Sequence, residues 1–561
     1  MTTPPVQPPT PASARSRTTE ATLPGGSAKH RGRAAADGGP DDDVRGRAAL
    51  RALGVDDGAT LSEGSGGAID VVSPLTGSLI GRVPRLEADD VARAVRRSRT
   101  AQSRWRRAPM RRRARVLLAL HDLIWRLRAP LLDLVQWECG KARAHAFEEL
   151  ADTAITARYY ARTGARHLAA ERRRGAVPGL TRTTVHHRPL GVVGIISPWN
   201  YPLTLAASDA VAALMAGNAV VLKPDSATPF TALAVHSLLR RAGADPDLLQ
   251  VVTGPGAALG ESLIDAVDAL MFTGSSATGS AVASRAGARL IPVSAELGGK
   301  NPLIVRADAP VARTVRGAVG ACFSNAGQLC VSIERVYVHE AVWDRFVPAF
   351  VRATRALRVG AAMGWGADMG PLISPEHLAK VAAHVSDAVA KGATVLTGGR
   401  ALPELSPTAY APTLLTGVTE DMDLHAAETF GPVACLYRVS GDEEAVRLAN
   451  ASPYGLNASV WTADRHAGAE LAGRIRAGTV NVNEGYAAAW GSTAAPMGGM
   501  GASGLGRRHG VEGIVKYTQS QTVAVQHLAP LHAPPGADGE RWASGMAAWL
   551  RLARRLPGLD R

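Results

Sequence analysis

The chain has 561 residues, of which 46% are hydrophobic, 20% are charged and 5% are aromatic. A chain of this length can bury a sizeable core, and no apolar run reaches the roughly 18 residues that a membrane-spanning helix needs. Its four cysteines are too few and too scattered for a disulfide scaffold, and no C-x-x-C or Cys/His cluster indicates zinc. These features exclude secreted disulfide-rich, fibrous and integral-membrane proteins. We expect a cytoplasmic protein without a bound metal.

The charged residues comprise 63 lysines and arginines and 49 acids, which gives a net charge of +14. An excess of this kind favours nucleic-acid binding, and thirteen arginines fall between Arg93 and Arg128. No nucleic-acid-binding motif accompanies them, so we interpret the segment as a solvated helix face and expect no nucleic-acid partner. Nucleic-acid binding remains the alternative that charge alone favours. The apolar residues at helical spacing in this segment are Val116, Leu117, Leu120, Leu123 and Ile124.

Residues 1–66 are predicted to form a disordered N-terminal extension. They are rich in proline, serine, glycine and arginine, include the run Asp41–Asp43, and show almost no aliphatic periodicity. The extension also has no apolar stretch of the kind found in secretory signals.

From about Ile69 to Val525, short β-rich runs alternate with helical stretches rich in alanine, leucine and arginine. This alternation predicts an α/β fold with a parallel sheet. The clearest runs, each followed by turn residues and a helical pattern, are 192–197, 219–222, 249–253 and 269–273.

Two strand-to-helix turns in this region carry candidate chemistry. Pro198 and Pro202 bracket Asn200 in a rigid turn that suits a fixed amide donor, with an ordinary β-to-α loop as the alternative. Further on, Gly274 and Gly279 stand five residues apart after a strand, where the backbone could approach a diphosphate at a helix N-terminus. This is not the G-x-G-x-x-G fingerprint, and an ordinary tight turn is the alternative.

Cys330 and Glu296 are a candidate nucleophile and base. A lone cysteine is usually an inert apolar residue, but Gly327 and Gln328 beside Cys330 are typical of a functional turn. Glu296 stands between an apolar run and a Gly-Gly turn, where it could act as a base or simply cap a helix or loop.

Together these motifs resemble the aldehyde dehydrogenase superfamily over about Ile69 to Val525. The 34-residue step from Glu296 to Cys330 is also the spacing of that family. The matching motifs, in family order, are Pro198–Pro202, Lys223–Pro224, Phe272–Gly279, Glu296–Lys300, Gly327–Cys330, Glu428–Pro432, Pro496–Gly499 and Ser503–Gly504. Within the superfamily, the closer matches look like the bacterial succinate-semialdehyde dehydrogenases of the NADP-linked type; they are Lys223–Pro229, Ser332–Arg335, Pro496–Met500 and Gly504–Gly510.

The resemblance implies an aldehyde-dehydrogenase-like α/β fold with a Rossmann-type cofactor domain, an α/β catalytic domain and a small β oligomerisation element. The cofactor-binding domain would cover residues 67–170 and 190–298, and the catalytic domain residues 299–510. Residues 171–189 and 511–527 would form the oligomerisation element, so a homodimer or homotetramer is expected. Residues 528–561 would be a linker and an amphipathic C-terminal helix.

The implied reaction is an oxidation of an aldehyde through a thioester. The Cys330 thiolate attacks the aldehyde carbon, and the Asn200 side chain and the Cys330 backbone N–H hold the oxyanion. The resulting thiohemiacetal gives hydride to a nicotinamide. Glu296 then activates the water that hydrolyses the thioester.

The resemblance also implies a cofactor site. Glu428 would hold the nicotinamide ribose with Phe430 nearby, Lys223 would reach the adenosine ribose, and Ser275 would lie at the diphosphate. Many NAD-preferring relatives carry glutamate at Ser226, so serine there predicts NADP, with NAD possible because Asp225 is adjacent. The full set of implied cofactor-binding residues is Trp199, Lys223, Ser226, Gly274, Ser275, Gly279, Glu428 and Phe430.

Succinate semialdehyde is the expected substrate, with one departure from the pattern. Semialdehyde-oxidising relatives often place an arginine at the position of Ser208, and Asp209 follows it here. Aromatic residues at Tyr486 and Trp490 would also suit an apolar aldehyde, so a broad aromatic or aliphatic aldehyde dehydrogenase is the alternative. A non-catalytic structural member of the fold is the lower alternative.

The C-terminal segment predicts an amphipathic helix from Trp542 to Leu556 that Pro557 ends. Its tryptophans share an apolar stripe, and arginines lie on the other side. We expect this stripe to dock on the protein's own surface or on a neighbouring subunit, and binding to an anionic membrane is the alternative.

Overall fold

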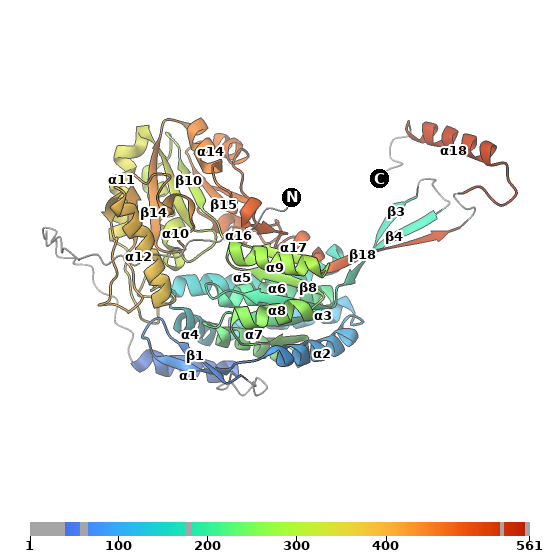
Figure 1. Cartoon of the computed structure of the whole chain (residues 1–561), viewed down its shortest axis with the longest axis horizontal. Coiled ribbons are helices and arrows are strands. Elements are labelled where there is room, and N and C mark those ends of the chain that lie inside the picture. Colours follow the sequence, from blue (N-terminus) through green and yellow to red (C-terminus); the bar gives the residue numbers. More distant parts are fainter. Residues whose placement is uncertain (1–39, 56–65, 176–180, 528–531, 556–561) are drawn as a thin grey trace, which may run out of the picture. The chain divides into compact units, whose positions relative to one another are not determined.

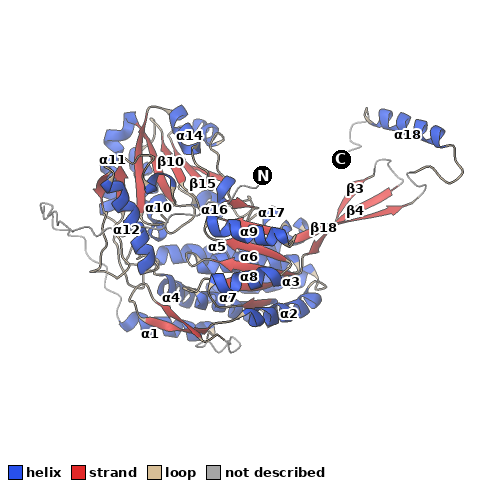
Figure 2. Ribbon diagram, viewed as in Figure 1, coloured by secondary structure: helices blue, strands red, loops and turns tan. Residues whose placement is uncertain are grey.

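The computed structural model of the protein describes residues 40–55, 66–175, 181–527 and 532–555 (Figures 1 and 2). Most of the predicted disordered extension, residues 1–39 and 56–65, lies outside the described residues. Helices and strands alternate along the chain, as the sequence pattern predicts (Figure 2). Among the described helices, none is both long and apolar enough to cross a membrane.

The first large sheet has six strands in the order β17-β9-β8-β5-β6-β7. The pairings among β5 to β9 are parallel, and β17 runs antiparallel to β9. The predicted parallel sheet is therefore confirmed. The strands are β5 (Val192–Ser197), β6 (Ala219–Pro224), β7 (Leu249–Val251), β8 (Ala269–Thr273), β9 (Val293–Glu296) and β17 (Gly504–Leu505).

Helices cover both faces of this sheet. Side chains alternate between the faces of a strand, so Val193 packs with α3 to α7, whereas Val192 packs with α2, α8 and α9. The strand order reverses at β5, and doubly wound sheets bind ligands at such a point, beyond the carboxyl ends of the strands. The helices are α2 (Ala88–Trp105), α3 (Met110–Arg126), α4 (Arg128–Cys139), α5 (Arg143–His167), α6 (Pro202–Ala216), α7 (Pro229–Arg241), α8 (Gly256–Ala266) and α9 (Ser276–Ala288).

The second large sheet has seven strands in the order β12-β13-β14-β11-β10-β15-β16, and all pairings except β12 with β13 are parallel. Its strands are β10 (Asn301–Val305), β11 (Ile333–His339), β12 (Thr394–Thr397), β13 (Thr413–Thr416), β14 (Val433–Val439), β15 (Asn457–Trp461) and β16 (Thr479–Val482). The helices that pack on it are α10 (Val311–Phe323), α11 (Glu340–Arg355), α12 (Pro375–Ala390), α14 (Asp442–Asn450) and α15 (Arg465–Ala472).

Two smaller sheets are antiparallel. One pairs β4 (Thr181–Pro189) with β3 (Glu171–Arg174) and β18 (Thr518–Gln526), and the other pairs β1 (Ala68–Val72) with β2 (Leu79–Pro84). The short elements are α13 (Asp423–Ala426), α16 (Ala487–Gly491), α17 (Glu512–Val515) and the 3-10 turns η1 (Pro246–Leu248), η2 (Ser324–Gly327) and η3 (Gly501–Ser503).

The prediction of disorder was wrong for helix α1 (Pro40–Leu53), which lies beside α4 (Figure 1). The aspartate run that we interpreted as part of a disordered segment lies in the first turn, at the positive end of the helix dipole. Leu50 and Leu53 are buried in the core, and Asp43 accepts a hydrogen bond from Trp137 Nε1 at 2.9 Å. Tertiary packing therefore stabilises a helix that the sparse apolar pattern did not reveal.

The arginine-rich segment forms α2 and α3, and its predicted apolar stripe is buried. Twelve of its thirteen arginines are exposed, which fits a solvated helix face. The thirteenth, Arg113, is buried and donates to the backbone oxygens of Met215 at 3.1 Å and Arg106 at 2.9 Å. Arg113 is therefore a structural residue.

The C-terminal helix is α18 (Gly539–Ala553). It begins three residues before the predicted start because Asp538 Oδ1 accepts hydrogen bonds from the backbone N–H groups of Glu540 and Arg541. None of the residues of α18 is buried. The predicted last residue, Leu556, lies outside the described residues.

Candidate active site

Four of the predicted site residues lie at the carboxyl ends of parallel strands in the six-stranded sheet. Asn200 follows β5, Lys223 is near the end of β6, Ser275 follows β8, and Glu296 ends β9. Parallel strands end at one edge of a sheet, so the topology brings these residues to the edge where doubly wound sheets bind ligands.

Asn200 is buried and held from several sides. Its Nδ2 donates to the backbone oxygen of Gln328 at 3.0 Å, which directs the amide toward the loop that carries Cys330. Its backbone oxygen accepts hydrogen bonds from Lys141 Nζ at 2.6 Å and Asn325 Nδ2 at 3.1 Å. The side-chain amide is therefore fixed in space, as an oxyanion donor must be.

A buried ion pair supports this turn. Lys141 pairs with Glu149, and both side chains are fully shielded from solvent. Glu149 Oε2 also accepts hydrogen bonds from the backbone N–H groups of Leu203 at 2.8 Å and Thr204 at 3.2 Å, at the start of α6. Sequence reasoning missed both charged residues, because neither stands in a recognisable motif.

The loop before Cys330 has an unusual backbone. Asn325, Ala326 and Gly327 have φ values of 51°, 55° and 70°, three successive left-handed residues. A Cβ atom at Gly327 would overlap the backbone oxygen of Gly431, so glycine is required there for a close approach of two loops.

Cys330 is the one cysteine of the four that is not fully buried. Burial raises the pKa of its thiol to about 12, and Glu428 and Glu296 add to this effect, whereas Arg508 lowers it. The thiol is therefore protonated at neutral pH and needs a base to become a nucleophile. Asn301 Nδ2 donates a hydrogen bond to the backbone oxygen of Cys330 at 2.8 Å.

Glu296 has the properties of a general base. It is 5% exposed, and burial raises its pKa to about 7, while Arg508 and Lys516 act to lower it. Its Oε1 atom has no hydrogen-bond partner within the described part of the chain. A carboxylate that titrates near neutrality and has a free oxygen suits proton transfer to and from water.

The other predicted nicotinamide-side residues lie together. Trp199 and Phe430 make an edge-to-face contact with their ring centroids 5.6 Å apart, and His377 packs against both rings. Glu428 Oε1 accepts a hydrogen bond from the backbone N–H of Gly299 at 2.9 Å, three residues beyond Glu296. Residues distant in sequence thus form one wall beside the candidate base.

Glu334 is a further residue of this wall that sequence reasoning did not single out. Its carboxylate accepts hydrogen bonds from the backbone N–H groups of Thr429 at 3.0 Å and Phe430 at 2.9 Å, and it pairs with the buried Lys300. The motif Ser332–Arg335 contained the only signal. The neighbouring Arg335 donates hydrogen bonds to the backbone oxygens of Lys300 and Ala449, so it is a structural residue.

The residues predicted to bind the adenosine side of the cofactor lie at and just beyond the end of β6. Lys223 is buried, burial lowers its pKa, and its Nζ donates to the backbone oxygen of Pro224 at 2.9 Å. Ser226 is partly exposed and donates to the backbone oxygen of Gly254 at 3.3 Å. Asp225 Oδ1 accepts a hydrogen bond from the backbone N–H of Ala227 at 2.9 Å, so its own turn holds that carboxylate.

The glycines at the start of α9 have a packing role beside the predicted cofactor role. A Cβ atom at Gly279 would overlap the Leu297 side chain, and one at Gly274 would lie 2.6 Å from the Phe272 ring. Both glycines therefore permit close packing within the protein. The feature suited to a diphosphate is the exposed N-terminus of α9, which begins after Ser275.

An aromatic and aliphatic cluster surrounds the thiol. Cys330 packs against buried residues that include Tyr201, Leu205 and Tyr486, and Trp490 lies 5.2 Å from Tyr201 between ring centroids. Tyr486 donates a hydrogen bond to Glu148, and burial raises the pKa of that carboxyl to about 7.

The position where an arginine was expected lies on α6 close to an acid. Ser208 is 9% exposed, and its hydroxyl lies 3.0 Å from Thr204 Oγ1 and 3.5 Å from Asp152 Oδ2. The surroundings of Ser208 are therefore polar and contain a hydroxyl and a carboxyl group.

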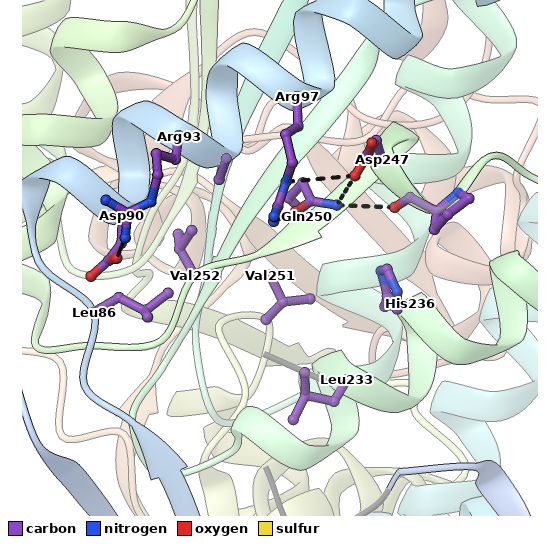
Figure 3. Close-up of a pocket in the computed structure, with 12 residues that line it drawn as sticks. Leu86, Asp90, Arg93, Arg97, Leu233, His236, Asp247, Gln250, Val251 and Val252 are labelled. Carbon is purple, nitrogen blue, oxygen red and sulfur yellow. Dashed lines mark hydrogen bonds and ion pairs between the residues drawn. The ribbon is translucent and has the colours of Figure 1, made fainter. Parts of the chain in front are cut away.

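A cavity of about 210 Å³ lies apart from these residues, beside the edge strand β7 (Figure 3). Its charged groups pair with one another, since Arg93 contacts Asp90 and Arg97 contacts Asp247. No predicted catalytic residue lines it. Across the described ranges, no three or more histidine, cysteine or acidic side chains are grouped as metal ligands would be.

Comparison with known proteins agrees with this geometry. Residues 61–523 match the model of the aldehyde dehydrogenase family. The chain is 50% identical over 483 residues to a protein of Mycolicibacterium smegmatis that is named provisionally as an NADP+ succinate-semialdehyde dehydrogenase; the match covers 86% of this chain and 93% of that protein. It is 35% identical over 473 residues to the NADP+ succinate-semialdehyde dehydrogenase GabD of Escherichia coli, covering 83% and 96% of the two chains.

Solved structures show the same fold. The succinate-semialdehyde dehydrogenase of Burkholderia pseudomallei superposes with a TM-score of 0.80 at 36% identity, covering 83% of this chain and 96% of that one. The NAD+ complex of an aldehyde dehydrogenase from Bacillus cereus superposes with a TM-score of 0.78 at 32% identity, covering 82% and 94%.

Proposed function

Because the chain belongs to the aldehyde dehydrogenase family, we propose that it oxidises succinate semialdehyde to succinate with NADP+. The observation that carries the proposal is the convergence of a fixed amide at Asn200, a partly exposed thiol at Cys330 and an unpartnered carboxylate oxygen at Glu296. The names of the relatives support the substrate and the cofactor.

In the proposed reaction, the partly exposed Cys330 thiol gives its proton to water, and the sulfur attacks the aldehyde carbon. The Asn200 amide stabilises the negative charge that develops on the aldehyde oxygen. Bound NADP+ would supply the hydride acceptor. Glu296 then takes a proton from the water that cleaves the Cys330 thioester, which releases the carboxylate and restores the thiol.

NADP+ rather than NAD+ is proposed because of the charge near the adenosine side. Serine at position 226 leaves no carboxylate to repel a 2′-phosphate, and Lys223 can supply a cation. The backbone N–H of Ala227 donates a hydrogen bond to Asp225 Oδ1, which holds this neighbouring carboxylate in its own turn. Trp199, Ser275, Glu428 and Phe430, with the glycines that shape the α9 turn, complete the proposed cofactor site.

We also propose roles for the three main sheets. The six-stranded sheet would be the cofactor domain, the seven-stranded sheet the catalytic domain, and the sheet of β3, β4 and β18 a subunit-pairing element of a homodimer or homotetramer. Val523 and Val525 on β18 are 40% and 47% exposed, which supports the last assignment. A cytoplasmic location is proposed because Cys330 must remain a free thiol, as reducing compartments ensure.

A second substrate class is favoured by a specific observation. Ser208 stands where a cation was expected, and Tyr201, Tyr486 and Trp490 lie around the thiol. An aromatic or aliphatic aldehyde would bury its apolar surface against these rings without needing a charge partner.

A substrate panel separates the two classes. Formation of reduced cofactor should be followed by absorbance with succinate semialdehyde, hexanal and benzaldehyde, each with NADP+ and NAD+. We expect the highest kcat/KM for succinate semialdehyde with NADP+. A higher kcat/KM for hexanal or benzaldehyde would make an apolar aldehyde, rather than succinate semialdehyde, the proposed substrate. If no aldehyde were turned over, the proposed function would be overturned.

A further inference from the structure

Helix α5 contacts both loops that carry the proposed catalytic groups. Its Glu149 holds the start of α6 just beyond Asn200. One helical turn earlier on the same face, His145 Nδ1 accepts a hydrogen bond from the backbone N–H of Asn325 at 3.1 Å, in the loop that leads to Cys330. His145 takes no part in the proposed reaction, yet it is a buried, titratable side chain that links α5 to the loop of the nucleophile.

Asn325 connects the loop of Cys330 to the turn of Asn200. Its Nδ2 donates hydrogen bonds to the backbone oxygens of Asn200 and Gln328, each at 3.1 Å. Its own backbone oxygen accepts a hydrogen bond from Gln328 Nε2 at 3.0 Å. Because its φ of 51° lies in the left-handed region, which is unfavourable for a residue with a Cβ atom, Asn325 depends on such contacts to keep its conformation. A shift of Asn325 would therefore move the nucleophile loop relative to the Asn200 amide.

His145 can accept this hydrogen bond because its ring is neutral. The side chain is 8% exposed, and burial, assisted by the cation of Lys141, lowers its pKa to about 4. At neutral pH the ring therefore carries one proton, and the hydrogen bond accepted at Nδ1 places that proton on Nε2. A side chain without an acceptor would fill the same space but leave the buried N–H of Asn325 without this partner, which is costly for a buried donor.

We propose that His145 is a positioning residue that fixes the loop of Cys330 at the distance from the Asn200 amide that oxyanion formation requires. A displacement of about 1 Å in a catalytic geometry costs roughly a hundredfold in rate. The aldehyde would bind against Tyr201 and Tyr486, which precede α6 and α16, so its affinity should depend little on His145. This inference rests on the roles of Cys330 and Asn200 in the proposed function.

Substitutions of His145 in the full-length protein test the acceptor separately from the packing. H145F and H145L remove the acceptor, whereas H145N and H145Q keep an acceptor oxygen. We expect H145F and H145L to lower kcat at least tenfold, with the KM for succinate semialdehyde changed less than about twofold. At least one of H145N and H145Q should recover most of the kcat. H236F removes a partly buried histidine on α7, so it is the matched control and should keep the parent kcat.

Thermal melting and near-UV circular dichroism identify the variants that fold. The proposal is overturned if folded H145F or H145L retains the parent kcat, or if H236F loses as much kcat as they do. It is also overturned if neither H145N nor H145Q exceeds them in kcat, because the imidazole would then contribute packing alone.

Alkylation of Cys330 by iodoacetamide gives a second measurement that needs neither aldehyde nor cofactor. Mass spectrometry of the peptide that contains Cys330 follows its rate. A released loop exposes the thiol, so we expect alkylation to be severalfold faster in H145F and H145L and close to the parent rate in H145N or H145Q. Equal rates in all variants would overturn the inference. The expected differences in rate, found in a protein that oxidises no aldehyde, would instead contradict the proposed function and leave the loop contact standing.

Discussion

Arg508 and Asp209 form a buried ion pair, with Nη2 of Arg508 2.7 Å and its Nε 3.0 Å from Oδ2 of Asp209. Burial alone would raise the pKa of Asp209, but Arg508 and Lys516 hold it at about 2. The pair therefore stays charged at all ordinary pH values. Arg508 also opposes the burial that raises the pKa of Glu296 to about 7.

Arg508→Gln should raise the pKa of Glu296 further, because it removes the cation that favours the carboxylate. In a plot of kcat against pH, the rise of activity on the acidic side, which we call the acidic limb, should move to higher pH. At pH 7, kcat should fall about tenfold. Steady-state rates measured between pH 5.5 and 9 check this. The double variant Asp209→Asn/Arg508→Gln removes both charges, so it should recover thermal stability. The rise of kcat should stay displaced, but less far than in Arg508→Gln, because Asp209 itself raises the pKa of Glu296 by a smaller amount. An unchanged limb in both variants would show that Arg508 does not tune the base.

Cys330→Ala should abolish dehydrogenase activity, because the other three cysteines are buried. Glu296→Gln should still release a burst of reduced cofactor equal to about one per active site, and then stall at the thioester. Rapid mixing with absorbance detection measures both phases. Full steady-state turnover by Glu296→Gln would disprove its assignment as the base.

In the parent enzyme, activity should rise with pH through about 7. The pKa of Glu296 is raised, so its carboxyl is protonated below that pH and cannot accept a proton from water. If Glu296 acts only in deacylation, the rate of hydride transfer in a single turnover should not show this rise with pH. Comparing single-turnover and steady-state profiles locates the step.

Lys141→Met should leave the buried carboxylate of Glu149 without its cation. The loss of one partner of a buried pair costs about 3–5 kcal/mol in the free energy of unfolding, so the Tm should fall by several degrees. The backbone of Asn200 also loses a donor, and kcat should fall with it. Lys141→Met/Glu149→Gln is the matched control. It should regain most of the stability but little of the activity, and a full recovery of kcat would show that Lys141 does not position Asn200.

Ser226→Glu should shift the cofactor preference toward NAD+, because a carboxylate there repels a 2′-phosphate and can bind ribose hydroxyls. The ratio of kcat/KM for NADP+ to that for NAD+ should drop at least tenfold. Ser226→Ala removes the hydroxyl without adding charge and should change the ratio little. A parent enzyme that already prefers NAD+ would contradict our interpretation of position 226.

Local patterns predicted the scaffold well. The strands expected at 192–197 and 269–273 have those bounds in the structure, since each is a short apolar run that ends in turn residues. The motifs also placed the site residues at strand ends, where the parallel sheet gathers them.

The residues that the sequence did not reveal depend on distant partners. Arg508 and Asp209 are 299 positions apart, and no local pattern indicates which charges will pair once buried. Helix α1 was missed for a related reason, because Leu50 and Leu53 are stabilised by α4 and its neighbours rather than by a strong amphipathic repeat. Gly274 and Gly279 were predicted to bind the cofactor, but no local pattern indicated that they also pack against Phe272 and Leu297.

The close approach of Gly327 to Gly431 has a consequence for protein engineering. The loop that carries Cys330 and the loop that carries Glu428 and Phe430 touch through their backbones, with no side chain between them to absorb a change. We therefore expect a change in either loop to disturb the proposed nucleophile and the proposed cofactor site together. Attempts to broaden the range of aldehydes should therefore leave both loops intact and vary the α6 face around Ser208 and the ring of Trp490.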